Sequence, residues 1–126
     1  MKEETRLWIN KAIEDFRTAE ILINVDDSPP AVICFHCQQS AEKYFKAFLV
    51  NKSVEFPRIH DLLELLERLI LPADQSFISI REASEILMDY AVAPRYPDYL
   101  FDPTRKDAMT AFNALKEIQQ FVQQKF

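Results

Sequence analysis

The sequence contains no glycine among its 126 residues. Glycine is the residue that adopts left-handed backbone conformations without steric cost, so any turn that needs this conformation must use another residue. Asparagine tolerates it better than most other residues. We therefore expect Asn24, at the end of the first helical segment, to take a left-handed conformation.

Long apolar runs are also missing. No uninterrupted stretch approaches the roughly 20 apolar residues that a membrane-spanning helix needs. The amino-terminal stretch MKEETRLWIN is polar and acidic, unlike a secretory signal. The sequence therefore predicts a cytoplasmic protein with no membrane partner.

Cysteine is scarce, and the two cysteines, Cys34 and Cys37, lie three residues apart. On one helix this spacing places them on adjoining turns, which suits a disulfide poorly. A C-x-x-C pair can hold zinc, but no second pair of ligands accompanies it. We expect buried or half-buried thiols and no metal site.

Basic residues are outnumbered by acidic ones, giving a net charge of −5 and a pI near 5.0. An acidic chain of this kind lacks the extended basic surface that duplex DNA requires. A small basic site within one cleft remains compatible with this balance, because the pI describes the whole chain.

What the sequence does contain is helical periodicity, in a length that suits a single domain spanning residues 1–126. Apolar residues recur at three- and four-residue steps in five segments, and no segment alternates as a strand does. Trp8 falls on the first of these stripes and is expected in the core. The expected helices run over 4–25, 29–50, 60–70, 74–91 and 103–126. This pattern predicts an all-α fold, an antiparallel bundle of about five helices with a four-helix up-and-down-like core and no sheet.

Helix ends carry their own signals. Ser28-Pro29 and Asp102-Pro103 each pair an N-cap residue with proline at the first helical position. Asp61 suits the first turn of the third helix, and Asn51 is a candidate C-cap for the second. The segment AVAPRYPDYLFDP, residues 91–103, interrupts the helical pattern with three prolines, two tyrosines and an arginine.

Three motifs occur in a fixed order along the chain: CFHCQQSAEKYFKAFLV, then RIHDLLELLERL, then RYPDY before the last helix. Together they resemble the HEPN domain family (higher eukaryotes and prokaryotes nucleotide-binding). The resemblance rests on paired glutamines followed by an alanine-glutamate-lysine step, a histidine-aspartate-leucine helix start, and an arginine-tyrosine-proline loop. It extends over essentially the whole chain.

The resemblance implies a helical bundle that forms homodimers and, in prokaryotes, is often encoded beside a minimal nucleotidyltransferase. Members act in toxin–antitoxin, defence and RNA-processing systems. Many are metal-independent ribonucleases, in which an arginine and a histidine separated by about four to six intervening residues meet across the dimer. The resemblance therefore implies a nucleotide or RNA as ligand and no other cofactor.

This sequence departs from that catalytic pattern. Counted from Arg95, the histidine position is occupied by Leu100, Phe101 or Asp102. Leucine and phenylalanine cannot transfer a proton, and general acid–base help is typically worth about a hundred- to ten-thousand-fold in rate. Whether the chain is an enzyme therefore stays open. If it cleaves RNA, the candidate catalytic residues are Arg95, His60 and Tyr99.

The candidate ligand-binding residues fall on three segments. Their side chains offer a guanidinium for phosphate, rings for stacking, and charged or amide groups for hydrogen bonds. They are Arg95, Tyr96 and Asp98 in the loop, Gln39, Glu42, Lys43 and Lys46 on the second helix, and His60 before the third. Each also has a purely structural interpretation: Arg95 can pair with Asp98, the tyrosines can cover the bundle end, and Glu42 with Lys46 can support an exposed helix face.

Three functions remain open at this point. The first is a HEPN-type homodimer that binds a nucleotidyltransferase partner, a nucleotide or an RNA end. The second is a divergent metal-independent ribonuclease. The third is a dimeric scaffold whose loop only shapes the end of the bundle.

Overall fold

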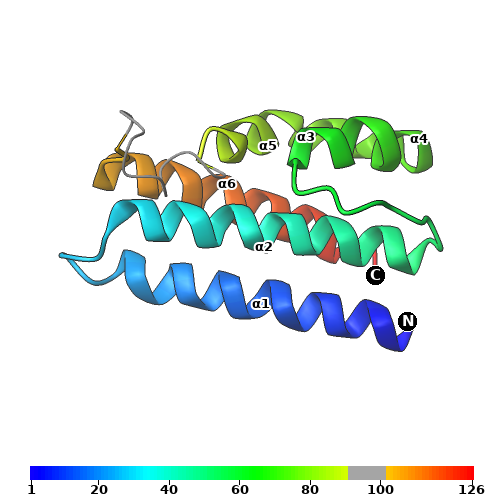
Figure 1. Ribbon diagram of the computed structural model, residues 1–126, viewed down its shortest axis with the longest axis horizontal. Helices are drawn as coiled ribbons and strands as arrows, with labels where there is room; N and C mark the ends of the chain where they lie inside the picture. The colour runs from blue at the N-terminus through cyan, green and yellow to red at the C-terminus, as the bar shows by residue number, and fades with distance from the viewer. Residues whose placement is uncertain (91–101) are drawn as a thin grey trace.

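The computed structural model describes residues 1–90 and 102–126, and within these ranges every regular element is a helix. The long helices are α1 (Glu3–Ile23), α2 (Pro30–Asn51) and α6 (Arg105–Gln123). Figure 1 shows them running side by side, with α2 between α1 and the rest of the molecule. The all-α bundle expected from the sequence is confirmed.

Helix α2 is the centre of the bundle, since it packs against both α1 and α6. Its fully buried aromatic residues, Tyr44, Phe45 and Phe48, face the interior. Phe77 inserts against them, with ring centroids 4.6 Å from Phe48 and 4.9 Å from Phe121 of α6. This ring cluster fixes α2, α6 and the shorter helices to one another.

The shorter helices form a second layer above α2 and α6 (Figure 1). One continuous helical segment consists of α3 (Leu62–Glu64), the π-helix η1 (Leu65–Ile70) and α4 (Leu71–Ala73). A 3-10 helix, η2 (Gln75–Ile80), then leads into α5 (Arg81–Met88). The expected single helix over 74–91 is therefore wrong in its first half, and α5 ends at Met88, before the expected end at Ala91, which itself lies outside the described residues.

Local hydrogen bonds explain where these short helices begin. The Asp61 side chain accepts from the Glu64 backbone N–H at 3.0 Å, so Asp61 is the N-cap of α3. Asp74 accepts from the Ser76 N–H at 3.0 Å and starts η2 as a tight turn. Asp61, expected in the first turn of the third helix, is thus the residue just before α3.

Other expected helix ends are shifted. The N-cap of α2 is Pro29 and its first residue is Pro30, one residue later than Ser28-Pro29 indicated, while its C-cap is Lys52 rather than Asn51. At α6 the N-cap is Thr104, not Asp102, because Thr104 and Asp107 form a reciprocal capping box.

The left-handed turn occurs elsewhere than expected. Asn24 has φ −93°, so its prediction was wrong. Among the described residues Ser53 has a positive φ, 59°, at the turn that follows α2. The Lys2 ammonium donates to the Val50 carbonyl at 3.0 Å and to the Ser53 hydroxyl. The first residues of the chain thereby hold the end of α2 in place.

Within residues 1–90 and 102–126 no helix is long and apolar enough to cross a membrane. Trp8, expected in the core, is half-buried beside Phe56 instead. Both cysteines are buried, as expected.

Candidate functional site

A buried carboxylate, Glu42, is the centre of a polar cluster on α2. Only 3% of Glu42 is exposed, yet three side chains reach it. The Lys46 ammonium lies 2.9 Å from Oε2, His60 Nδ1 lies 3.0 Å from the same oxygen, and the Gln38 amide donates to Oε1 at 3.2 Å. We call Gln38, Glu42, Lys46 and His60 the Glu42 cluster.

Lys46 compensates the charge of Glu42 from one helical turn away. Its side chain is 6% exposed, so the pair is removed from water and not on an exposed face. The Nζ atom also lies 5.6 Å from the ring centroid of Trp8 and 5.8 Å from that of Phe56. The ammonium is therefore surrounded by one carboxylate and two aromatic rings, which together replace its hydration.

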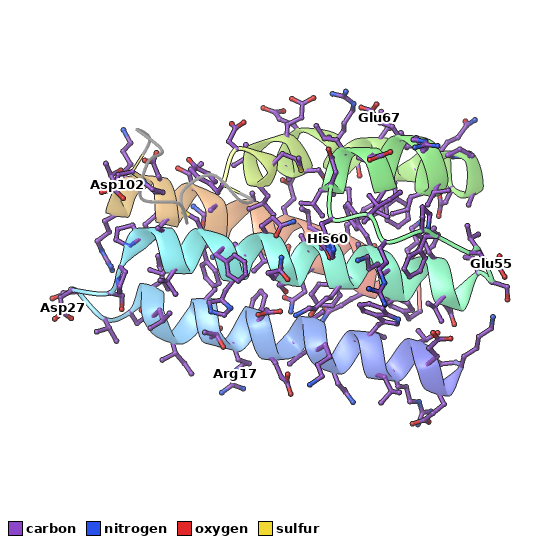
Figure 2. All side chains as sticks on the ribbon, viewed as in Figure 1. Arg17, Asp27, Glu55, His60, Glu67 and Asp102 are labelled. Carbon is purple, nitrogen blue, oxygen red and sulfur yellow. The ribbon has the colours of Figure 1, made fainter. Side chains whose placement is uncertain are left out.

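His60 is the part of the cluster that meets solvent, since 71% of its side chain is exposed. Its backbone is fixed on both sides: its carbonyl accepts from Gln38 at 3.2 Å, and the next residue, Asp61, caps α3. Figure 2 shows His60 above the middle of α2, at the end of the connector, residues 52–61, which leads back from the end of α2.

The geometry of His60 defines its chemistry. A neutral ring whose Nδ1 donates to Glu42 has an unprotonated Nε2, which can accept a proton or a hydrogen bond. A protonated ring keeps its ion pair with Glu42 and offers an Nε2–H donor to a phosphate oxygen. A buried acid that orients an imidazole in this way is a common arrangement for proton transfer and for anion binding.

A second polar cluster lies on the α1 side of α2. One carboxylate oxygen of Asp15, on α1, lies 2.8 Å from His36 Nδ1. The other oxygen accepts a hydrogen bond from the Lys43 ammonium. These side chains are 13 to 27% exposed. Lys43, a candidate ligand-binding residue, thus lies apart from the Glu42 cluster: one residue on a helix is about 100° of rotation, which turns Lys43 towards α1.

Gln39 is half-buried and donates to the Gln38 side-chain oxygen at 2.8 Å, so it extends the Glu42 cluster. The remaining predicted site residues, Arg95, Tyr96, Asp98 and Tyr99, lie outside the described residues. The structure thus joins Gln39, Glu42, Lys46 and His60.

Sequence reasoning missed the contributions of Trp8, Phe56, Asp15 and His36. Trp8 falls on the apolar stripe of α1, where an aromatic residue indicates core. Phe56 lies in a connector without periodicity, so no pattern marks it. Asp15 directly precedes Phe16 of the same stripe, which is a signal that its carboxylate lies at the edge of a helix interface.

Other ionisable groups near the start of α6 have a structural role. Burial raises the pKa of the Cys34 thiol to about 12, and the nearby Asp107 charge adds to this. Burial, followed by the charge of Asp107, raises the pKa of Tyr90 to about 12, and its hydroxyl lies 3.3 Å from Asp107 Oδ1. In residues 1–90 and 102–126 no three His, Cys, Asp or Glu side chains are grouped as metal ligands.

Comparison with known proteins gives a consistent result. A family model described as "HEPN domain" matches residues 5–125. A protein of Methanocaldococcus jannaschii named "Putative toxin MJ1304" is 27% identical, and the match covers 96% of this chain and 90% of that protein.

Two solved structures are similar over almost their entire length. TT1696 from Thermus thermophilus is 28% identical with a TM-score of 0.84, and the match covers 99% of this chain and 100% of that one. ST0689, described as "an archaeal HEPN homologue", is 28% identical with a TM-score of 0.72, covering 98% and 97%.

Proposed function

The chain belongs to the HEPN domain family, and we propose that it is a homodimeric binding module that holds a nucleotide or a single-stranded RNA end at the Glu42 cluster. The module works beside a minimal nucleotidyltransferase in a toxin–antitoxin-like or defence system. The relative named as a putative toxin supports this context.

The observation that carries the proposal is the position of His60. An imidazole that is 71% exposed is held by a carboxylate that is 4% exposed, and that carboxylate is neutralised by Lys46. This arrangement holds an imidazole in a fixed orientation at the surface of an acidic protein. One charge-assisted hydrogen bond to a phosphate oxygen is worth roughly 1.5–3 kcal/mol, or about tenfold or more in affinity.

A matched pair of histidine variants tests the proposal. His60 and His36 each place Nδ1 against a carboxylate, but His36 belongs to the Asp15 cluster. Binding of a fluorescent 12-nucleotide single-stranded RNA and of ATP is measured by anisotropy and calorimetry. His60→Ala is expected to weaken binding about tenfold, and His36→Ala to leave it unchanged.

Absence of binding to both ligands by the wild-type protein overturns this function. Equal affinity of His60→Ala and wild type, together with a loss of stability in His60→Ala, favours the scaffold instead. The dimer is tested separately by sedimentation of the wild-type protein across a concentration series.

A second candidate function is a metal-independent ribonuclease, favoured by the free acceptor site at His60 Nε2. In this case His60 takes the proton-transfer role that the motif histidine would have, together with Arg95. Cleavage of single-stranded RNA in the presence of EDTA is expected to be abolished by His60→Ala and Arg95→Ala and retained by His36→Ala. Cleavage that survives Arg95→Ala contradicts this function.

A further inference from the structure

A cavity of about 570 Å³ lies next to the Glu42 cluster, between the start of α1 and the connector that follows α2. This volume is within the range of roughly 300–1,000 Å³ typical of small-molecule sites. Six of its lining residues determine its chemistry: Lys2, Glu4 and Trp8 near the start of the chain, and Val54, Glu55 and Phe56 of the connector.

Two aromatic rings connect the cavity to the cluster. Trp8 and Phe56 meet edge to face, with centroids 6.2 Å apart and an interplanar angle of 67°. Both rings line the cavity, and the Lys46 ammonium lies 5.6 Å from one ring centroid and 5.8 Å from the other. The cavity and the Glu42 cluster therefore share one aromatic wall, which offers a planar ligand a surface to stack on.

The charges at the cavity favour one class of ligand. The ammonium of Lys2 is used by the Val50 carbonyl and the Ser53 hydroxyl, whereas the carboxylates of Glu4 and Glu55 are exposed hydrogen-bond acceptors. Two negatively charged carboxylates disfavour the binding of a phosphate group. They suit a neutral ring that carries N–H donors.

An organic cation fits less well than a neutral ring. The position near both aromatic rings, where a cation is most stable, is already taken by the Lys46 ammonium. A second cation there would be repelled by the first.

We propose that this cavity binds an unpaired nucleobase with an exocyclic amino group, such as adenine. The base stacks on the Trp8–Phe56 wall and donates its amino protons to Glu4 or Glu55. The inference deepens the proposed function, because the connector runs from Glu55 at the cavity to His60 in the cluster (Figure 2). An RNA end held at His60 thus has a site for a base next to it.

The single tryptophan of the chain makes the test specific. Because Trp8 lines the cavity, its fluorescence reports occupancy of this site. The wild-type protein is titrated with adenosine, adenosine 5′-monophosphate and ribose 5-phosphate. We expect saturable quenching by the two ligands that carry a base and none by ribose 5-phosphate. Quenching that is equal for all three overturns the inference.

Two variants with matched controls locate the site. Val54→Phe adds a ring to the cavity lining, whereas Val25→Phe places the same change on an exposed residue just beyond the opposite end of α1. At least a tenfold loss of adenosine affinity is expected for Val54→Phe and none for Val25→Phe. If Val54→Phe fails to fold, Glu4→Lys compared with its neighbour Glu3→Lys decides, because Glu3 does not line the cavity.

The outcomes separate this inference from the function on which it rests. Undiminished adenosine and RNA binding by the Val54→Phe and Glu4→Lys variants overturns the cavity and leaves the function at His60 standing. Adenosine binding that the cavity variants remove, in a protein whose RNA and ATP affinities are unchanged by His60→Ala, supports the cavity and overturns the function at His60.

Discussion

Replacing Lys46 by methionine removes the positive charge that balances Glu42 and keeps most of the side-chain volume. Glu42 then keeps two partners, the Gln38 amide at 3.2 Å and His60 at 3.0 Å, but loses its nearest charge. Breaking a buried ion pair from one side typically costs about 3–5 kcal/mol. The remaining hydrogen bonds place the expected loss near the lower end, about 3 kcal/mol.

The chain provides a matched control for this substitution. Glu64 and Arg68 form an ion pair with the same i, i+4 spacing and the same direction, but their side chains are 38% and 69% exposed. Arg68→Met is expected to cost about 0.5 kcal/mol or less, since exposed helix pairs contribute roughly 0.3–0.5 kcal/mol. The difference between the stability losses of Lys46→Met and Arg68→Met therefore measures the effect of burial, because the spacing of the two pairs is the same.

Urea unfolding followed by circular dichroism at neutral pH measures both losses. A third variant, Glu42→Met combined with Lys46→Met, replaces the whole pair by apolar groups and is expected to be within about 1 kcal/mol of wild type. A loss below about 1 kcal/mol for Lys46→Met would refute the reasoning. So would a double variant that is less stable than either single one.

Further predictions concern the helix ends and two ionisable groups. Thr104→Ala should cost about 1 kcal/mol in urea unfolding, because it removes the capping box of α6, and Asp102→Ala, outside that cap, should cost almost nothing. The Lys125 hydrogen bond lowers the pKa of Asp74 to about 2. Its stabilisation is thus present above the unfolded value near 3.8 and lost as the pH falls through the folded value, so Asp74→Asn should be less stable than wild type at pH 6, with the difference shrinking below pH 3.8 and vanishing only below pH 2. Cys34, whose pKa is raised to about 12, should react with a thiol reagent at pH 8 only after unfolding; rapid labelling of the folded protein would contradict its burial.

The long helices could be predicted from the sequence because their apolar residues keep one period over several turns. The 3-10 helix over residues 75–80 could not be predicted in this way, because the segment has the apolar pattern of an α-helix. The Asp74 side chain accepts a hydrogen bond from the Ser76 N–H, and the first turns are tightened into a 3-10 helix. At α6 two N-cap residues compete within three positions. Thr104 is the N-cap because Asp107 lies three residues after it and completes the capping box.

The candidate site was predictable in its members and not in its environment. The motif identified Glu42, Lys46 and His60, but an i, i+4 pair has the same spacing whether it is exposed or buried. Its burial depends on the connector, which folds back along α2 and brings Phe56 and His60 to it from distant positions in the sequence. Such non-local packing leaves no local pattern to detect.

The buried Glu42–Lys46 pair also has an evolutionary consequence. It joins α2 to Trp8 of α1 and to the connector at Phe56 and His60, and losing either partner alone leaves an uncompensated buried charge, so a lineage in which His60 no longer binds a ligand is expected to keep both residues or to replace both together. The fold, with Trp8 and Phe56 in place, can therefore be retained in relatives in which His60 has been replaced. The exposed imidazole of His60, rather than the pair beneath it, is the position where selection for the proposed binding should be sought among relatives.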